Sequence, residues 1–315
     1  MDDNRPRSRG RRGHYEVWFL TMSAPDGSSG YWIRHTTHLP VSGPPDRRLW
    51  FARFDRGDPD RTFGINGALG ATVPPERAWF DGSSARGAVA GAGHDVRWDL
   101  RLTPAGDPIR ILPRPFYVRG VLPTRPFTPG PDVAIDGEIE VDGEAVSAGG
   151  FRGHQGHVEG TRHAERWAWA QCSALDGGHA FQVLSAQGRR GPILTPFLTF
   201  AVIRIDGTWV RLRGPRGRTW GLGTWKLSLR SRDLRVEGQV TAPREQLLRT
   251  RYLDPDDTPR WCHHTDVASS RLMLWRRGRD GWDQRADLVS DGTTHAEWAG
   301  RTPAKVIDRV HEVVR

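Results

Sequence analysis

Residues 153–171, GHQGHVEGTRHAERWAWAQ, decide the fold, because the last of them alternate strictly between large and small side chains. Successive side chains of a β-strand point to opposite faces, so this alternation predicts a strand with two different faces. One face carries Trp167, Trp169 and Gln171, and the other carries Ala168, Ala170 and Cys172. A broad aromatic face with a polar end is typical of a strand that lines an apolar pocket.

The rest of the chain repeats the β signal. Short apolar or alternating runs are separated by Asp-Gly and other Gly-containing turns, as in residues 96–103, VRWDLRLT, where apolar and polar side chains alternate. Helical periodicity is almost absent before residue 303, so we expect an all-β protein built from hairpins, in a meander or barrel. Only residues 303–314 predict a helix, because Pro303 suits a first turn and an apolar stripe follows it.

The length of 315 residues exceeds one typical core, so two domains are expected. Residues 1–14 are charged and contain Gly and Pro without an apolar run, which predicts a disordered basic tail. A Gly, Pro and Arg break near Pro192 predicts a boundary there, with an N-terminal domain of residues 15–192 and a C-terminal domain of residues 193–315. Prolines recur between residues 109 and 131, so an extended connection rather than a central strand is expected.

The formal charge of +9 raises the question of nucleic-acid binding. Only two lysines occur, Lys226 and Lys305, and the arginines are spread along the chain among Asp and Glu, which indicates an ordinary solvated surface. No stretch approaches the roughly 20 apolar residues that span a bilayer, and the N-terminus has no signal-peptide pattern. We therefore expect a soluble, cytoplasmic protein with no nucleic-acid partner and no membrane span. The oligomeric state is not predicted.

Cysteine and histidine spacing does not predict a metal site. Cys172 and Cys262 lie in apolar patterns and are expected to be reduced and buried in a cytoplasmic chain. The three histidines within residues 154–163 lack the paired spacing of a zinc module. His263 and His264 are adjacent, so on a strand they point to opposite faces.

The order of the segments resembles one superfamily. YWIRHT, LWFARFD and VRWDLRL are followed by the Pro-rich crossover, the DGEIEVDG hairpin, a G-x-x-x-H-x-x-G segment ending in W-x-W-x-Q-C, and a late Tyr-x-Asp-Pro before Cys262. From Tyr15 onward the chain is similar to the hydroxyneurosporene synthase (carotenoid hydratase) and AttH-like proteins, relatives of the tocopherol cyclases and lipocalin-like pericyclases. The resemblance implies two lipocalin-like antiparallel β-barrel domains and a hydrophobic cavity for an isoprenoid- or polyketide-derived molecule. It supplies no metal or organic cofactor.

The reaction stays open, since the superfamily includes hydration, cyclisation and cycloaddition. In its hydratase and cyclase members a carboxylate or Tyr is expected just before a His-x-Trp-Gly run. Here Gly156 precedes His157, and Glu159 occupies the Trp place before Gly160. One acidic group is missing and another is present, so the substrate chemistry does not transfer directly.

Glu159 and His157 are the predicted catalytic residues. Hydration or cyclisation of an alkene needs an acid beside an apolar double bond, and burial among aromatic rings keeps a carboxyl group protonated. Glu159 would donate the proton and His157 would orient it or move it, since side chains two residues apart on a strand point the same way. In the alternative interpretation, Glu159 pairs with Arg162 or Arg166 on a solvated turn.

The predicted substrate-binding residues are those expected to face the same cavity. Tryptophan rings stabilise a cation by about 0.5 to 2 kcal/mol each, although tryptophan also serves as ordinary core packing in β-barrels. Asp55 follows an aromatic strand and is an alternative acid. The set is Trp167, Trp169, Gln171, His154 and Asp55.

The sequence supports two functions from different classes. The first is a cofactor-independent enzyme of lyase or isomerase type that hydrates, cyclises or rearranges an apolar isoprenoid-like or polyketide-like molecule. The second is a non-catalytic lipocalin-like carrier of such a hydrophobic small molecule. A buried carboxyl group that points into the cavity would favour the enzyme. The sequence motifs of serine hydrolases, P-loop proteins and dinucleotide-binding enzymes are absent.

Overall fold

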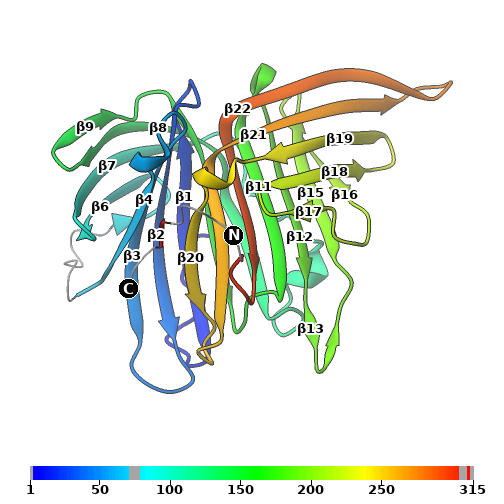
Figure 1. Ribbon diagram of the computed structural model, residues 1–315. Coiled ribbons are helices and arrows are strands. Elements are labelled where there is room, and N and C mark those ends of the chain that lie inside the picture. Colours follow the sequence, from blue (N-terminus) through cyan, green and yellow to red (C-terminus); the bar gives the residue numbers. More distant parts are fainter. Residues whose placement is uncertain (1–2, 71–78, 305–310, 313–315) are drawn as a thin grey trace.

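The computed structural model describes residues 3–70, 79–304 and 311–312, and almost all of its regular structure is antiparallel β-sheet. Figure 1 shows two sheets side by side, one from the N-terminal half of the chain and one from the C-terminal half. The predicted all-β fold with two barrel-like sheets is confirmed. No helix in the described part of the chain is long and apolar enough to cross a membrane.

The first sheet contains ten strands in the order β4-β3-β2-β1-β10-β8-β7-β6-β5, with β9 paired to β8. The strands are β1 (His14–Ser23), β2 (Ser29–Leu39), β3 (Asp46–Asp55), β4 (Phe63–Ala68), β5 (Trp79–Phe80), β6 (Ser84–Gly91), β7 (His94–Pro104), β8 (Thr124–Val141), β9 (Glu144–Ser147) and β10 (Phe151–Gly160). Strands β4 and β6 contact each other without a ladder, so the sheet curls into a nearly closed barrel.

The second sheet has eleven strands in the order β17-β18-β16-β15-β12-β11-β22-β21-β20-β23. Strand β19 pairs with both β18 and β21 and thereby closes the barrel. The strands are β11 (Arg166–Leu175), β12 (His179–Gln187), β15 (Leu198–Ile205), β16 (Thr208–Arg213), β17 (Trp220–Gly221), β18 (Thr224–Arg230), β19 (Leu234–Thr241), β20 (Leu248–Leu253), β21 (Pro259–Arg277), β22 (Trp282–Gly300) and β23 (His311–Glu312).

The remaining elements are short. Strands β13 (Arg189–Arg190) and β14 (Ile193–Leu194) form a hairpin of their own. Among the described residues, the strands are also connected by the 3₁₀ turns η1 (Pro59–Arg61), η3 (Arg114–Tyr117), η4 (Asp176–Gly178) and η5 (Arg244–Gln246). Most of the predicted helix at residues 303–314 lies outside the described residues, and its described residues 311–312 form β23, which pairs in parallel with β20.

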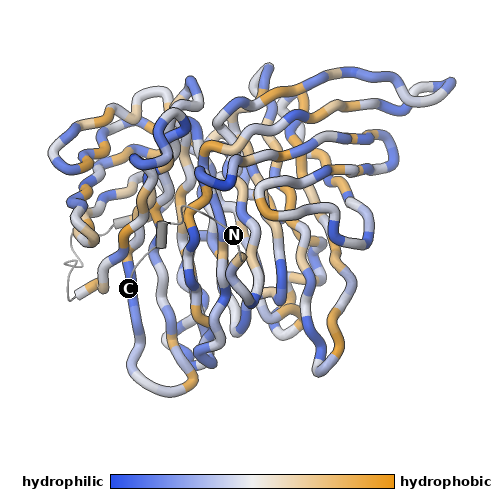
Figure 2. Tube along the Cα trace, viewed as in Figure 1, coloured by the Kyte–Doolittle hydropathy of each residue, from blue (hydrophilic) through white to orange (hydrophobic). Residues whose placement is uncertain are grey.

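Each barrel has its own apolar core, and Figure 2 shows that hydrophobic residues are spread along the strands of both sheets. The first core includes Leu20, Ile33, Phe51, Trp98 and Ile135. The second core includes Ala168, Ala170, Cys172, Trp225 and Trp298. The small face of the predicted 167–172 strand is therefore buried inside the second barrel. Cys172 and Cys262 are free and buried, as predicted.

The boundary between the sheets differs from the predicted position near Pro192. Strands β11 and β12 pair with β22 and β15 and so belong to the second sheet. The division therefore lies between Gly160 and Arg166. The Gly, Pro and Arg run that suggested a boundary forms the small β13–β14 hairpin.

The Pro-rich stretch was also predicted wrongly, because its last part is the start of β8 in the middle of the first sheet. Here β8 pairs with β10 from Thr124 onward, whereas its pairing with β7 involves Val133 and later residues. The prolines thus lie where β8 has only one neighbour in the sheet. A missing N–H donor is tolerated there as on an edge strand.

Candidate functional site

The outer faces of the two barrels pack against each other to form an inter-barrel layer. Strands β10, β1, β2 and β3 contribute one side, and β11, β22, β21 and β20 contribute the other. Polar contacts cross the layer: Gln171 Nε2 donates to Thr21 Oγ1 over 2.8 Å, and Ser23 Oγ donates to the Asp266 carbonyl over 2.9 Å. The layer is therefore a buried surface with both aromatic and polar side chains.

Four of the five predicted substrate-binding residues meet in this layer. Trp167, Trp169 and Gln171 share one face of β11, as predicted, and all three are buried. His154 joins them from β10, with its ring centroid 5.2 Å from that of Trp169. Their predicted role in ligand binding remains a prediction.

Asp55 is separate from this group. It ends β3, where its Oδ1 accepts the backbone N–H groups of Gly57 over 3.1 Å and Asp58 over 2.9 Å. The carboxylate therefore caps a turn, which is a common task for Asp after a strand.

Glu159 does not face the tryptophans. It lies on the opposite face of β10 from His154, is 1 % exposed, and forms an ion pair with Arg125. His14 Nε2 lies 2.7 Å from its other oxygen. Burial raises the pKa of Glu159, but His14 and Arg125 outweigh burial and leave the pKa lowered. The predicted acid needs a neutral carboxyl group beside Trp167 and Trp169, and this position supplies neither condition.

His157 shares the face of Glu159 and holds the N-terminal segment. Its Nδ1 donates to the Asp3 carbonyl over 2.6 Å and its Nε2 to Glu16 Oε1 over 2.8 Å, and the ring stacks on Trp18. Both partners can only accept, so both ring nitrogens donate. Neither nitrogen is free for a substrate.

The N-terminal segment is correspondingly ordered, in contrast to the predicted disordered tail. Glu16 accepts the backbone N–H groups of Arg7 and Ser8, over 2.6 and 2.9 Å. Asp3 is 5 % exposed and pairs with Arg110. These contacts fix residues 3–13 against the first barrel.

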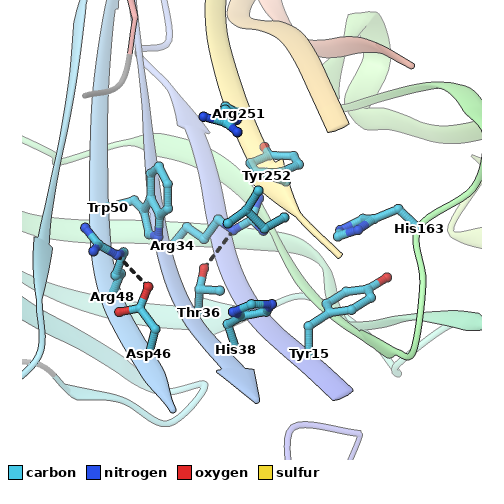
Figure 3. Close-up of a pocket in the computed structure, with 11 residues that line it drawn as sticks. Tyr15, Arg34, Thr36, His38, Asp46, Arg48, Trp50, His163, Arg251 and Tyr252 are labelled. Atoms are coloured by element: carbon cyan, nitrogen blue, oxygen red, sulfur yellow. Dashed lines mark hydrogen bonds and ion pairs between the residues drawn. The ribbon is translucent and has the colours of Figure 1, made fainter. Parts of the chain in front are cut away.

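A pocket opens at one edge of the inter-barrel layer, and Figure 3 shows the side chains around it. Strands β1, β2 and β3 supply one wall, β20 supplies the other, and the connection between the barrels supplies His163. The lining residues are Tyr15, Arg34, Thr36, His38, Asp46, Arg48, Trp50, His163, Arg251, Tyr252 and Leu253. Aromatic rings alternate there with cationic groups.

His163 is the residue of this pocket best placed for proton transfer. Its Nδ1 lies 2.7 Å from Oδ1 of Asp254, which is fully buried, and the same oxygen accepts the His163 backbone N–H. Arg260 Nη2 holds the other oxygen of Asp254 at 2.8 Å. A carboxylate accepts, so Nδ1 carries the proton and leaves Nε2 with a lone pair.

The protonation state of this pair follows from its surroundings. Burial lowers the pKa of His163, and the hydrogen bond to Asp254 only partly opposes this effect. Burial raises the pKa of Asp254, but the bond from His163 outweighs burial, so the carboxylate stays ionised. Within the described chain, no side chain hydrogen-bonds to His163 Nε2, and Figure 3 shows the ring between Tyr15 and Tyr252.

Three aromatic rings lie close to His163 and nearly parallel to its imidazole. Its ring stacks on Tyr15, with centroids 4.1 Å apart, and lies 5.9 Å from Tyr252 and 5.7 Å from Trp167. Burial raises the pKa of both tyrosines, so their hydroxyl groups keep their protons. The pocket thus combines a neutral imidazole with protonated phenols.

The sequence contained partial signals for these residues. Tyr252 and Asp254 form the Tyr-x-Asp-Pro motif that contributed to the family resemblance, but His163 stood out only as one histidine of a cluster. Arg34 lies on β2 between Trp32 and Thr36, a mixture of charge and aromatic side chains on one strand face. In the described residues, no three His, Cys, Asp or Glu side chains are arranged to hold a metal ion.

Known proteins with a similar sequence come from Mycobacterium tuberculosis. The chain is 30% identical over 303 residues to "Uncharacterized protein MT0513" of strain CDC 1551 / Oshkosh, a match that covers 93% of this chain and 88% of that protein. "Uncharacterized protein Rv0493c" of strain H37Rv matches to the same extent. The chain belongs to the family of these proteins. No family model matches the sequence.

Three solved structures resemble the fold. CghA with Sch210972 matches with a TM-score of 0.57 and 11% identity, over 91% of this chain and 88% of CghA. Kievitone hydratase from Nectria haematococca matches with a TM-score of 0.50 and 10% identity, over 91% and 89%. A protein described as AttH from Nitrosomonas europaea has a TM-score of 0.46 and 14% identity, over 92% and 93%. CghA and kievitone hydratase therefore share the fold of this chain, as the predicted resemblance implied.

Proposed function

We propose that the protein is a cofactor-independent enzyme that binds an apolar isoprenoid-like or polyketide-like molecule in the inter-barrel pocket. It would catalyse a hydration, cyclisation or rearrangement in which His163 moves a proton. The observation that carries the proposal is the buried Asp254 paired with Nδ1 of a neutral His163, which lines the pocket and whose Nε2 has no side-chain hydrogen bond within the described residues. Two solved structures of this fold support the proposal through their names: one is a kievitone hydratase, and the other is CghA with Sch210972.

The chemistry assigned to His163 requires only what its surroundings supply. Asp254 fixes the tautomer and stabilises the imidazolium that forms when Nε2 takes a proton, as in other histidine–carboxylate pairs. The Tyr15 hydroxyl already pairs with Thr124 Oγ1 over 2.6 Å, so the rings of Tyr15 and Tyr252 would contact the apolar part of the ligand beside His163. The proton-transfer role thus moves from Glu159, where the sequence placed it, to His163.

Replacement of His163 tests this proposal. His163→Gln keeps a polar side chain but removes the base, so turnover should fall by a factor on the order of 10² to 10⁴ while ligand affinity changes little. Turnover is followed by mass spectrometry on prenylated and polyketide compounds, and affinity by quenching of tryptophan emission.

The matched control is His94→Gln. His94 also pairs with an aspartate, since its Nδ1 lies 2.8 Å from Asp142, but it is partly exposed at a hairpin far from the pocket lining. This change should leave turnover intact. Wild-type turnover in His163→Gln would refute the assignment.

The carrier function stays as the second candidate because Glu159, the carboxylate expected in the cavity, faces away from it. A carrier needs the aromatic rings that line the pocket but no proton-accepting residue such as His163. A ligand that binds tightly and is recovered unchanged, together with no turnover across the panel, would favour the carrier.

A further inference from the structure

Arg34 is a buried cation without a carboxylate partner among the described residues. It lies on β2 and is 7 % exposed, and its Nε donates to Thr36 Oγ1 over 3.1 Å. Other buried arginines are neutralised: Arg260 lies 2.8 Å from Asp254, and Arg53 lies 3.5 Å from Asp55. Burial of a charge without a counter-charge is unfavourable, so Arg34 differs from the rest of the layer.

Aromatic rings rather than anions surround this guanidinium. Its Cζ lies 3.9 Å from the ring centroid of Tyr252, 5.6 Å from that of Trp32 and 5.9 Å from that of Trp50. Ring faces attract a cation but do not neutralise its charge. The Thr36 bond occupies Nε, and the two terminal nitrogens are left for another partner.

The pocket offers no anion to Arg34 from its own lining. Asp46 is the only carboxylate among the lining residues, and its Oδ2 is held by Arg48 Nε over 2.8 Å, as the dashed line in Figure 3 shows. The counter-charge is therefore expected to come from the ligand. The rings of Tyr15, Trp50 and Tyr252 would contact the apolar part of such a ligand.

We propose that Arg34 binds the carboxylate of the ligand, which makes the ligand an apolar organic acid. The planar guanidinium presents two parallel N–H groups that match the two oxygens of a carboxylate. This inference rests on the proposed ligand pocket and narrows its substrate class, but it does not depend on the proton-transfer role of His163.

A matched pair of probes tests the inference on the full-length protein. 2-Naphthoate carries a carboxylate and 2-naphthamide is its neutral counterpart with the same ring system. Isothermal titration at pH 7.5 should show that the wild-type protein binds naphthoate roughly 10- to 100-fold more tightly than naphthamide. Arg34→Gln should remove this preference and leave naphthamide affinity nearly unchanged. Arg34→Lys keeps the positive charge but lacks the two parallel N–H groups, so it should show an intermediate preference for naphthoate.

Arg251→Gln is the control, since Arg251 lines the same pocket but is exposed. It removes the same unit of charge and should retain the preference for naphthoate. Equal affinity of the wild-type protein for the two probes, absence of naphthoate binding, or an equal loss in Arg251→Gln would overturn the inference. If Arg34→Gln does not fold, the inference is tested by the relative affinity of the wild-type protein for naphthoate and naphthamide and by the same measurement on Arg34→Lys. His163→Gln should keep the preference, so a failure of the proposed proton transfer is distinguished from a failure of this site.

Discussion

Glu159 illustrates how one residue can satisfy a sequence-based prediction of burial and still lack the predicted chemistry. Burial alone would raise its pKa and make it an acid, but Arg125 and His14 lie against it and lower the pKa. The sign of the shift depends on partners at distant sequence positions. A carboxylate that neutralises a partly buried arginine serves stability rather than proton donation.

Glu159→Gln should therefore destabilise the fold. The change removes the counter-charge of Arg125, which is 15 % exposed, and breaking such a pair costs about 3 to 5 kcal/mol when fully buried and somewhat less here. Urea unfolding at pH 7 measures this loss, while naphthoate affinity of the folded protein should stay close to wild type. Glu144→Gln, in an exposed pair with Arg61, should cost only about 0 to 1 kcal/mol. Equal small effects in both variants would contradict this role for Glu159.

At the scale of elements, the structure of the strands can be predicted from local sequence far better than that of the N-terminal segment. Strand alternation is local, so the direction of Trp167 and Trp169 could be predicted from neighbouring residues alone. The order of residues 3–13 depends on contacts with His157 and Arg110, which no local pattern contains. Composition therefore predicted a disordered tail where the fold supplies partners.

Removal of residues 1–12 should loosen the first barrel selectively. Glu16 would lose two backbone donors, and His157 would lose the Asp3 carbonyl. Hydrogen exchange followed by mass spectrometry should show faster exchange in β1 and β10, with β18 and β19 of the second barrel unchanged. Unaltered protection in β1 and β10 would show that the segment adds little to stability.

The candidate site was predictable only in part, because some of its residues meet only through contacts between distant parts of the sequence. The aromatic strand and the Tyr-x-Asp motif could be recognised, but His163 lies in a connection without periodicity and meets Asp254, 91 positions later in the sequence, only in the folded chain. The boundary near Pro192 was wrong because the β11–β12 hairpin has the same local pattern as the hairpins before it. Sheet membership is a property of long-range pairing.

At the scale of the whole molecule, buried imidazoles in the inter-barrel layer link stability to pH. Burial lowers the pKa of His154 to about 3, with a smaller effect from the charge of His295. Burial also lowers the pKa of His264 well below its usual value. A histidine that is neutral in the fold takes up a proton on unfolding when the pH is below about 6.5.

The folded-state pKa of His154 lies below the unfolded one, so the unfolded state binds more protons as the pH falls. Stability should be retained above about pH 6.5 and lost progressively toward pH 3, by up to about 1.4 kcal/mol per pH unit from this one residue. Urea unfolding of the wild-type protein and His154→Gln between pH 7 and 5 isolates this effect, because carboxylates titrate at lower pH. Parallel pH profiles for the two proteins would exclude His154 as a source.

The two walls of the pocket come from different barrels, and this division affects how the family can diversify. Arg34 and Trp50 lie before the connection that follows Gly160, whereas His163, Tyr252 and Asp254 lie within or after it. A single crossover at this connection during recombination between two relatives would exchange the wall that recognises the ligand and leave the histidine–aspartate pair intact. New ligand preferences can thus arise in one genetic step while the existing chemistry is inherited unchanged.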